Sequence, residues 1–225
     1  MSTTNLPTGM TNAADGTPLG SYTAFDPSLT HAWFNDFDSF IAAEWTVTET
    51  QVGATQGIAN GDGGILALVN TAANNDLNAI QLANETFAFT AGKQAWFKAR
   101  FKLSSATNAA AVIGLQITDT TPLAVTDGVF FSKAAASTTL NLVVEKSSTA
   151  TTTVVGTMAD DTYVEVGFYY NGTDTIVAYL GGQSVATSVV TNLPAHTLCV
   201  SIAVANGTAA ANTMSIDYLF AATER

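Results

Sequence analysis

The chain has 225 residues, of which 47% are hydrophobic and only 11% are charged. Its 18 acidic residues outnumber its 7 basic ones and give a formal net charge of -11. This balance disfavours nucleic-acid binding, which requires clustered lysine and arginine, and no stretch approaches the ~20 apolar residues of a membrane span. The first residues lack the basic and apolar segments of a secretory signal, so we expect synthesis in the cytoplasm.

Residues 1–30 show no hydrophobic periodicity and contain three prolines and three glycines. This composition predicts an irregular N-terminal arm, followed by one β domain over residues 31–225. We expect the arm to lie on a neighbouring subunit, with folding back onto its own domain as the alternative. The residues expected to anchor it are Leu6, Pro7, Met10, Leu19, Tyr22 and Phe25.

From His31 onward the sequence consists almost entirely of strand patterns separated by turn signals such as Asn171-Gly172 and Asn206-Gly207. One short helix is expected over residues 37–44. Many short strands without helical crossovers predict an antiparallel sandwich. The expected strands cover residues 33–37, 45–51, 64–69, 79–82, 95–103, 111–118, 128–132, 139–146, 152–157, 163–170, 175–180, 184–190, 197–205 and 213–221.

The strand over residues 95–103 carries the clearest pattern. Phe97, Phe101 and Leu103 point to one side with Ala99, while Lys98, Arg100 and Lys102 point to the other, because side chains alternate along a strand. The basic face is either a solvated outer face that prevents edge pairing or an ionic seam with an acidic partner or a second copy of the chain. The only cysteine, Cys199, lies in an apolar run and is expected to be a buried small hydrophobe.

Several segments resemble, in their order along the chain, the concanavalin A-like (laminin G-like) jelly roll, and most closely the versions found in structural proteins of tailed bacteriophages. They include Gly63-Gly64-Ile65-Leu66-Ala67-Leu68, the 95–103 strand, Gly128-Val129-Phe130-Phe131 and Ile216-Asp217-Tyr218-Leu219. The resemblance covers nearly the whole chain. It implies an all-β, antiparallel jelly-roll β-sandwich.

Laminarinase-type hydrolases share this fold and use two carboxylates on one strand, in a Glu-x-Asp-x-x-Glu pattern. No such pattern occurs here: Glu49 and Glu165 stand alone, and Asp160-Asp161 are adjacent acids in a turn. His31 and His196 are the only histidines, and no nucleophile-elbow or zinc-protease motif is present. The sequence therefore predicts a protein that is not an enzyme.

Related jelly rolls often hold a structural calcium ion near an aspartate of the last strand. The resemblance places Asp217 at that position, with Asn35, Asp36 or Asp38 as companions, and oxygen ligands of this kind suit calcium. The alternative is that Asp217 only accepts hydrogen bonds at the edge of the sandwich. We expect no other cofactor.

Carbohydrate binding requires exposed aromatic side chains, since these pack against sugar rings. The three tryptophans, Trp33, Trp45 and Trp96, lie in strand patterns, and we expect them in the core. Tyr22 and Tyr169-Tyr170 are the aromatic residues expected at the surface.

The resemblance implies a bacteriophage virion protein on the capsid exterior, made in the host cytoplasm. We expect a capsid-decoration (cement) protein that the arm anchors to the major capsid protein or to other virion subunits. Symmetric self-association is expected, with a trimer as the favoured form. The alternative is a carbohydrate-binding, lectin-like fibre or tail module.

Overall fold

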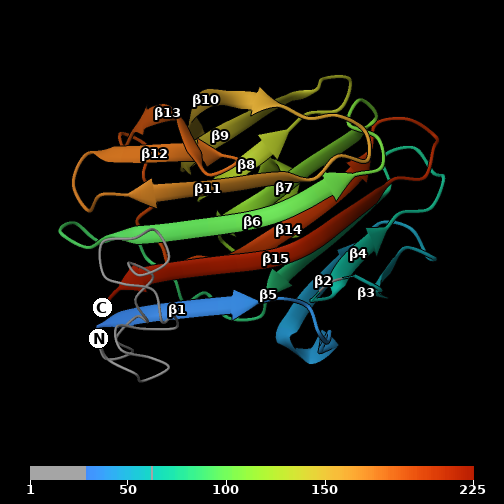
Figure 1. Cartoon of the computed structure of the whole chain (residues 1–225), viewed down its shortest axis with the longest axis horizontal. Coiled ribbons are helices and arrows are strands. Elements are labelled where there is room, and N and C mark those ends of the chain that lie inside the picture. The colour runs from blue at the N-terminus through green and yellow to red at the C-terminus, as the bar shows by residue number, and fades with distance from the viewer. Residues whose placement is uncertain (1–28, 62) are drawn as a thin grey trace, which may run out of the picture.

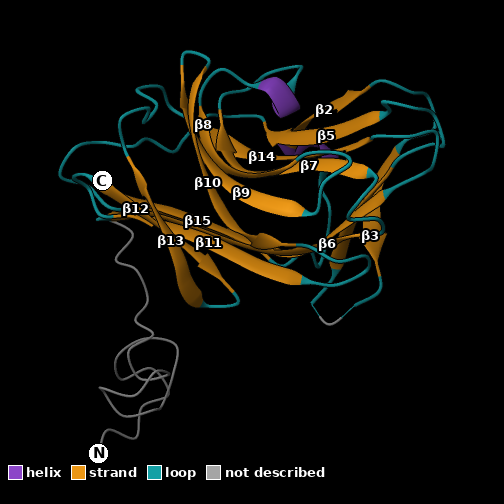
Figure 2. Cartoon of the chain, turned by 90° about the horizontal axis from the view of Figure 1, so that it is seen from above, coloured by secondary structure: helices purple, strands orange, loops and turns teal. Residues whose placement is uncertain are grey.

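The computed structural model describes residues 29–61 and 63–225, which form two antiparallel β-sheets packed face to face (Figures 1 and 2). The prediction of an all-β jelly-roll sandwich is confirmed. Two 3-10 turns, η1 (Ala42–Glu44) and η2 (Pro122–Ala124), are the helical elements of the described part of the chain. The proposed anchoring residues, from Leu6 to Phe25, lie outside the described residues.

Each sheet is assembled from strands that are far apart in the sequence. Sheet A has the order β13 (Gln183–Val189), β12 (Thr175–Leu180), β11 (Val164–Tyr170), β6 (Ala95–Leu103), β15 (Thr213–Glu224), β4 (Ile65–Val69) and β3 (Thr55–Ala59). Its eighth strand, β1 (Thr30–Asn35), pairs with the C-terminal half of β15. Sheet B has the order β10 (Thr149–Thr157), β9 (Thr139–Lys146), β8 (Gly128–Lys133), β7 (Ala109–Gln116), β14 (Cys199–Asn206), β5 (Leu77–Leu82) and β2 (Trp45–Glu49).

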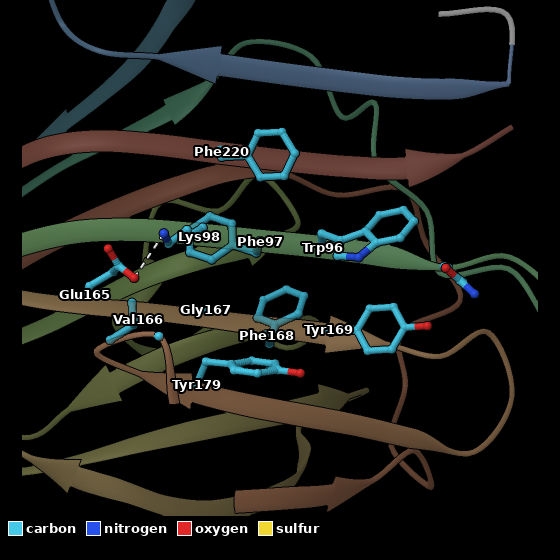
Figure 3. Close-up of a pocket in the computed structure, with 12 residues that line it drawn as sticks. Trp96, Phe97, Lys98, Glu165, Val166, Gly167, Phe168, Tyr169, Tyr179 and Phe220 are labelled. Atoms are coloured by element: carbon cyan, nitrogen blue, oxygen red, sulfur yellow. Dashed lines mark ion pairs between the residues drawn. The ribbon is translucent and has the colours of Figure 1, made fainter. Parts of the chain in front are cut away.

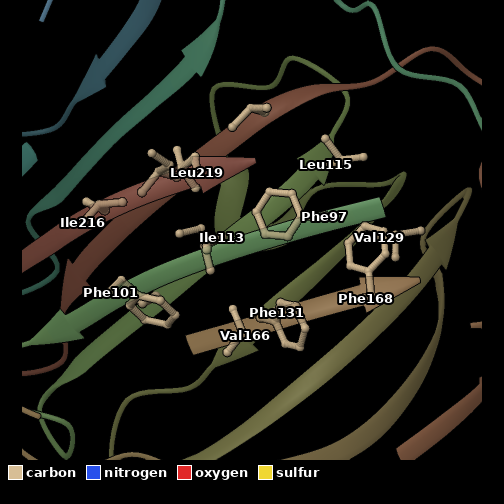
Figure 4. Close-up of a cluster of buried hydrophobic side chains, with 14 of the residues drawn as sticks. Phe97, Phe101, Ile113, Leu115, Val129, Phe131, Val166, Phe168, Ile216 and Leu219 are labelled. Atoms are coloured by element: carbon tan, nitrogen blue, oxygen red, sulfur yellow. The ribbon is translucent and has the colours of Figure 1, made fainter. Parts of the chain in front are cut away.

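Aromatic rings from both sheets form the centre of the core (Figure 4). The predicted inner face of β6 is correct: Phe97, Phe101 and Leu103 are buried together with Ala99. Phe97 stacks on Phe168 of β11, with ring centroids 5.4 Å apart, and Phe168 lies 6.3 Å from Phe131 of sheet B. Because removing a buried phenylalanine side chain typically costs about 3–5 kcal/mol, these contacts make β6 and β11 a rigid support for whatever lies on their outer face.

The local structure differs from the sequence expectations at two places. Residues 37–44 are not a helix, apart from η1, because Phe37 adopts a φ of 53° and turns its ring into the core. Gly64 lies against this turn so closely that an added Cβ would stand 2.1 Å from the carbonyl oxygen of Phe37. Strand β3 was not predicted, since Thr55–Ala59 is a short segment interrupted by Gly57, and its pairing with β4 forms it.

The outer face of sheet B is partly covered by the chain's own loop between β7 and β8. Gln116 donates a hydrogen bond to the carbonyl oxygen of Pro122 (3.0 Å). Gln81 donates a hydrogen bond to the carbonyl oxygen of Ile117 and accepts one from the amide of Asp119. Below the loop lies a second apolar cluster that includes Phe130 and Val125. This loop therefore shields part of sheet B from solvent.

Cys199 is fully buried beside this loop, as predicted. Its thiol lies 3.3 Å from the carbonyl oxygen of Gln116, to which it donates. Burial raises the pKa of the thiol to about 11, although a hydrogen bond with Thr118 opposes the change. A thiol held in its neutral form and shielded from solvent is inert.

Lys133 is a buried cation on the inner face of β8, at the end of the core. Its ammonium donates a hydrogen bond to the carbonyl oxygen of Ala109. Burial lowers its pKa from 10.5 to about 8, and the negative charge of Asp160 limits the change. The unfolded chain therefore keeps this proton to a higher pH than the folded chain does.

Between about pH 8 and 10.5 the folded state binds fewer protons at Lys133 than the unfolded state does. We therefore expect the free energy of unfolding to increase with pH in that window. Relative to Lys133→Met, the wild type should gain up to about 1.4 kcal/mol of unfolding free energy per pH unit. Urea unfolding at pH 7.5 and 9.5 measures the change. Lys146→Met, at an exposed lysine of β9, is the control for loss of a positive charge, and equal pH dependence in wild type and Lys133→Met would contradict the assignment.

Candidate functional site

The outer face of sheet A collects aromatic and charged side chains around the middle of β6. Trp96, Lys98 and Arg100 point outward from this strand, opposite to the buried side chains. Antiparallel pairing places Trp96 opposite Tyr169 of β11, and Lys98 opposite Gly167. On the other side of β6, Lys98 is opposite Phe220 of β15.

These residues surround a hollow of about 550 Å³ in the outer face (Figure 3). Gly167 interrupts the row of outward side chains between Lys98 on β6 and Tyr179 on β12, because glycine contributes no side chain. The aromatic rings around the hollow come from four strands. The partly exposed ones are Trp96, Tyr169, Tyr179 and Phe220, and the buried Phe97 and Phe168 lie beneath them.

One end of the hollow carries an ion pair between Lys98 and Glu165, whose charged atoms are 3.0 Å apart. Tyr218 donates a hydrogen bond of 2.7 Å to the other carboxylate oxygen of Glu165. Burial favours a higher pKa for Glu165, but the hydrogen bonds from Tyr218 and Lys98, with the nearby positive charges, lower its pKa overall. Burial and the bond to Glu165 raise the pKa of Tyr218, so this end of the hollow holds a carboxylate and a neutral phenol.

Arg100 and Lys102 continue the basic row beyond the hollow. Arg100 pairs with Asp217 and lies over the ring of Tyr163, 4.2 Å from its centroid. Lys102 pairs with Asp161 at 3.3 Å. Each cation of the predicted ionic seam, Lys98, Arg100 and Lys102, thus has a carboxylate partner within the chain, and contact of the seam with an acidic partner stays a prediction.

A bulge in β15 creates the position of Asp217. The pairing with β6 shifts between Ile216 and Tyr218, so two residues of β15 face one residue of β6. Ile216 and Leu219 both lie in the core as a result, although they are three positions apart. Tyr218 is thereby left on the outer face beside Glu165.

The acidic residues proposed for calcium do not gather into a metal site. The carboxylate of Asp217 binds Arg100, that of Asp36 lies against Gly63, and Asp38 is exposed. Within residues 29–61 and 63–225, no group of three or more His, Cys, Asp or Glu side chains is arranged to hold a metal ion. Asp217 thus serves Arg100 in the structure, and calcium binding stays a prediction.

The buried and the exposed aromatic residues are not all those that the sequence predicted. Trp45 is buried and Trp33 packs against it, with ring centroids 6.0 Å apart. Trp96 was expected in the core but lines the hollow, 5.7 Å from Tyr169. Trp96 and Lys98 are two positions apart in β6, so their side chains lie on the same face of the strand. This spacing could have predicted that Trp96 points to the outer face. Tyr169 is partly exposed and lines the hollow. Tyr170 was also expected at the surface, but it is buried because its side chain points to the core.

The carboxylates considered for hydrolysis are dispersed. Glu49 accepts from Gln56, Glu165 binds Lys98, and Asp160 accepts from the amide of Ala106. The structure instead brings Glu145 of β9 near Asp127, at the start of β8. Burial, followed by the negative charge of Asp127, raises the pKa of Glu145.

Asp127 is itself unusual. Its side chain is buried, one carboxylate oxygen accepts from Thr126, and the other has no hydrogen-bond partner among the described residues. A buried acid with an unused oxygen next to a second acid whose pKa is raised is an arrangement found at acid–base sites.

Comparisons with known proteins identify the fold. No protein-family model matches the sequence, and no curated protein matches it. Among solved structures, a protein of unknown function from Shewanella oneidensis MR-1 is similar over 87% of both chains, with 14% identity and a TM-score of 0.60. A β-1,3-1,4-glucanase (lichenase) from a mouse hindgut metagenome has a TM-score of 0.62 and 12% identity, over 84% of this chain and 98% of that one. The carbohydrate recognition domain of Emp46p has a TM-score of 0.56 and 10% identity, over 84% and 93%.

The chain therefore has the jelly-roll β-sandwich fold that glucanases and carbohydrate recognition domains share. These similarities correct one prediction. The exclusion of enzyme activity was wrong, because glycosidic hydrolases occur among the proteins with this fold. The prediction relied on the absence of linear motifs, and carboxylates that are apart in the sequence can lie near one another in the fold without such a motif, as Glu145 and Asp127 do.

No helix within the described residues is long and apolar enough to cross a membrane.

Proposed function

We propose that this protein binds carbohydrate in the hollow on the outer face of sheet A. The observation that carries the proposal is the cluster of partly exposed aromatic rings around Gly167, set on a rigid pair of strands. A sugar ring has apolar C–H faces and polar hydroxyl edges. Aromatic side chains suit the faces, because Trp and Tyr combine a large apolar surface with a polar group.

The polar groups of the hollow complement the sugar's hydroxyl groups. Lys98 can donate hydrogen bonds and Glu165 can accept them, and their ion pair fixes both groups in place. A small number of fixed polar groups among apolar walls is typical of small-molecule sites. Proteins of similar fold include a carbohydrate recognition domain and a β-1,3-1,4-glucanase, which supports a sugar as the ligand.

Trp96→Ala should weaken glycan binding about tenfold or more, since it removes the largest ring of the hollow. A glycan array identifies the ligand, and affinity electrophoresis in soluble β-1,3-1,4-glucan measures retardation. Leu123→Ala, at a partly exposed apolar residue of the other sheet's loop, is the control and should bind like the wild type. The proposal fails if the wild type binds no glycan, or if Trp96→Ala binds as well as the wild type.

The same protein can have a role in a virion. We retain the proposal of a bacteriophage capsid-decoration protein anchored through residues 1–30, with the glycan-binding fibre or tail module as its alternative. Its support is the order of the sequence motifs between Gly63 and Leu219 that resemble the phage proteins.

Deletion of residues 1–30 should leave the sandwich folded but unable to attach to particles, because the expected anchoring residues are lost. Circular dichroism and co-sedimentation with capsids that lack the protein measure the two properties. Undiminished co-sedimentation of the truncated protein would exclude the arm as the anchor.

Hydrolysis is a second candidate, favoured by the raised pKa of Glu145, which lies opposite Gly128, and by the buried oxygen of the preceding Asp127 that has no hydrogen-bond partner among the described residues. A carboxylic acid with a raised pKa can act as a general acid, and its loss typically costs about 100-fold or more in rate. Any release of reducing sugar from β-1,3-1,4-glucan by the wild type should therefore fall by that factor in Glu145→Gln. Glu49→Gln, at an exposed glutamate of β2, is the control. A wild type that releases no sugar, or a fully active Glu145→Gln, would rule this candidate out.

A further inference from the structure

We propose that the ligand is an uncharged, linear oligosaccharide that lies across the strands of sheet A and reaches from β12 to β1. This inference rests on the proposed carbohydrate-binding function and adds the direction, length and charge of the ligand. It follows from the register of five adjacent strands, from an exposed aromatic residue outside the hollow, and from the pairing of charges on this face.

The register forms one continuous row across the sheet. Tyr179 is opposite Gly167, which is opposite Lys98. Lys98 is opposite Phe220, and Phe220 is opposite Phe34 of β1. Five adjacent strands span roughly 19 Å from the first to the last, at about 4.8 Å between neighbours. A pyranose ring is about as wide as one strand spacing, so the row has room for roughly four sugar rings.

Phe34 extends the aromatic surface beyond the hollow. It does not line the hollow itself, yet 61% of its surface is exposed, and its ring lies 6.4 Å from that of Tyr218. It continues the row that Phe220 begins at the rim of the hollow. A large apolar side chain at the end of a row of aromatic groups is placed to hold the far end of a long ligand.

The charges on this face favour an uncharged ligand. Lys98, Arg100 and Lys102 are each paired with a carboxylate of the chain. A charged sugar would have to compete with these pairs, and it would lose hydration without gaining an unpaired opposite charge. A neutral sugar can instead use the remaining hydrogen-bonding positions of Lys98 and Glu165 while their ion pair stays intact.

Calorimetry on the full chain tests the inference, with β-1,4-linked and mixed β-1,3-1,4-linked glucose oligomers of two to six units as probes. Affinity should rise with length up to about four units and then level off. Phe34→Ala should weaken binding of the hexasaccharide by about three- to tenfold and leave the disaccharide unchanged, whereas Trp96→Ala should weaken both. A galacturonic acid oligomer of equal length, which is negatively charged, should bind at least about tenfold more weakly.

The control is Val154→Ala, at an apolar residue of sheet B with a similar exposed fraction of 63%. Equal affinities for the disaccharide and hexasaccharide, with no effect of Phe34→Ala, would overturn the long site but leave carbohydrate binding standing. If no oligomer binds and the glycan array is also negative, the proposed function itself fails. A dimer in analytical ultracentrifugation that Phe34→Ala dissociates, without glycan binding, would assign this face to a second copy of the chain instead.

Discussion

The pairing of β6 with β11 and β15 is the constraint on which the rest of this structure depends. On its inner side it stacks Phe97 on Phe168, and Phe168 in turn lies beside Phe131 of the opposite sheet. On its outer side it sets Trp96 beside Tyr169 and leaves Gly167 next to Lys98. Because side chains alternate, a shift of one residue would exchange the two faces, and the packed core therefore fixes the outer arrangement too.

The ion pairs on the outer face matter for geometry more than for stability. Lys98 and Arg100 are roughly half exposed, and exposed pairs contribute about 0–1 kcal/mol each. Their effect is to hold Glu165 charged, to position Tyr218 and to leave the face without an unpaired cation among the three. In the sequence, the three basic residues of β6 resemble a positively charged binding surface. In the structure, each of their charges is balanced by a neighbouring carboxylate.

The two sheets differ in what they leave accessible. The outer face of sheet B is partly covered by the β7–β8 loop, whose backbone is bound by Gln81 and Gln116. The outer face of sheet A carries a hollow, which forms where one glycine interrupts a row of larger side chains. Proteins with 10–14% identity share the whole sandwich, so the fold does not define the site. The site lies in the few outward residues that each protein places on it.

The sequence by itself determined the fold class and most strands, because alternation and turn residues are local patterns. It also assigned the two faces of β6 and the burial of Cys199. The sequence did not predict that Phe37 turns into the core, because this turn depends on contact with Gly64. It also did not predict β3, because this strand forms through its pairing with β4. Only the tertiary structure decided that the basic residues have partners in the chain and that the β15 bulge turns Tyr218 outward. The reason is physical: ion pairs, bulges and the hollow join residues that can be more than a hundred positions apart, as Arg100 and Asp217 are. Strand register, which depends on the whole core, brings such residues together.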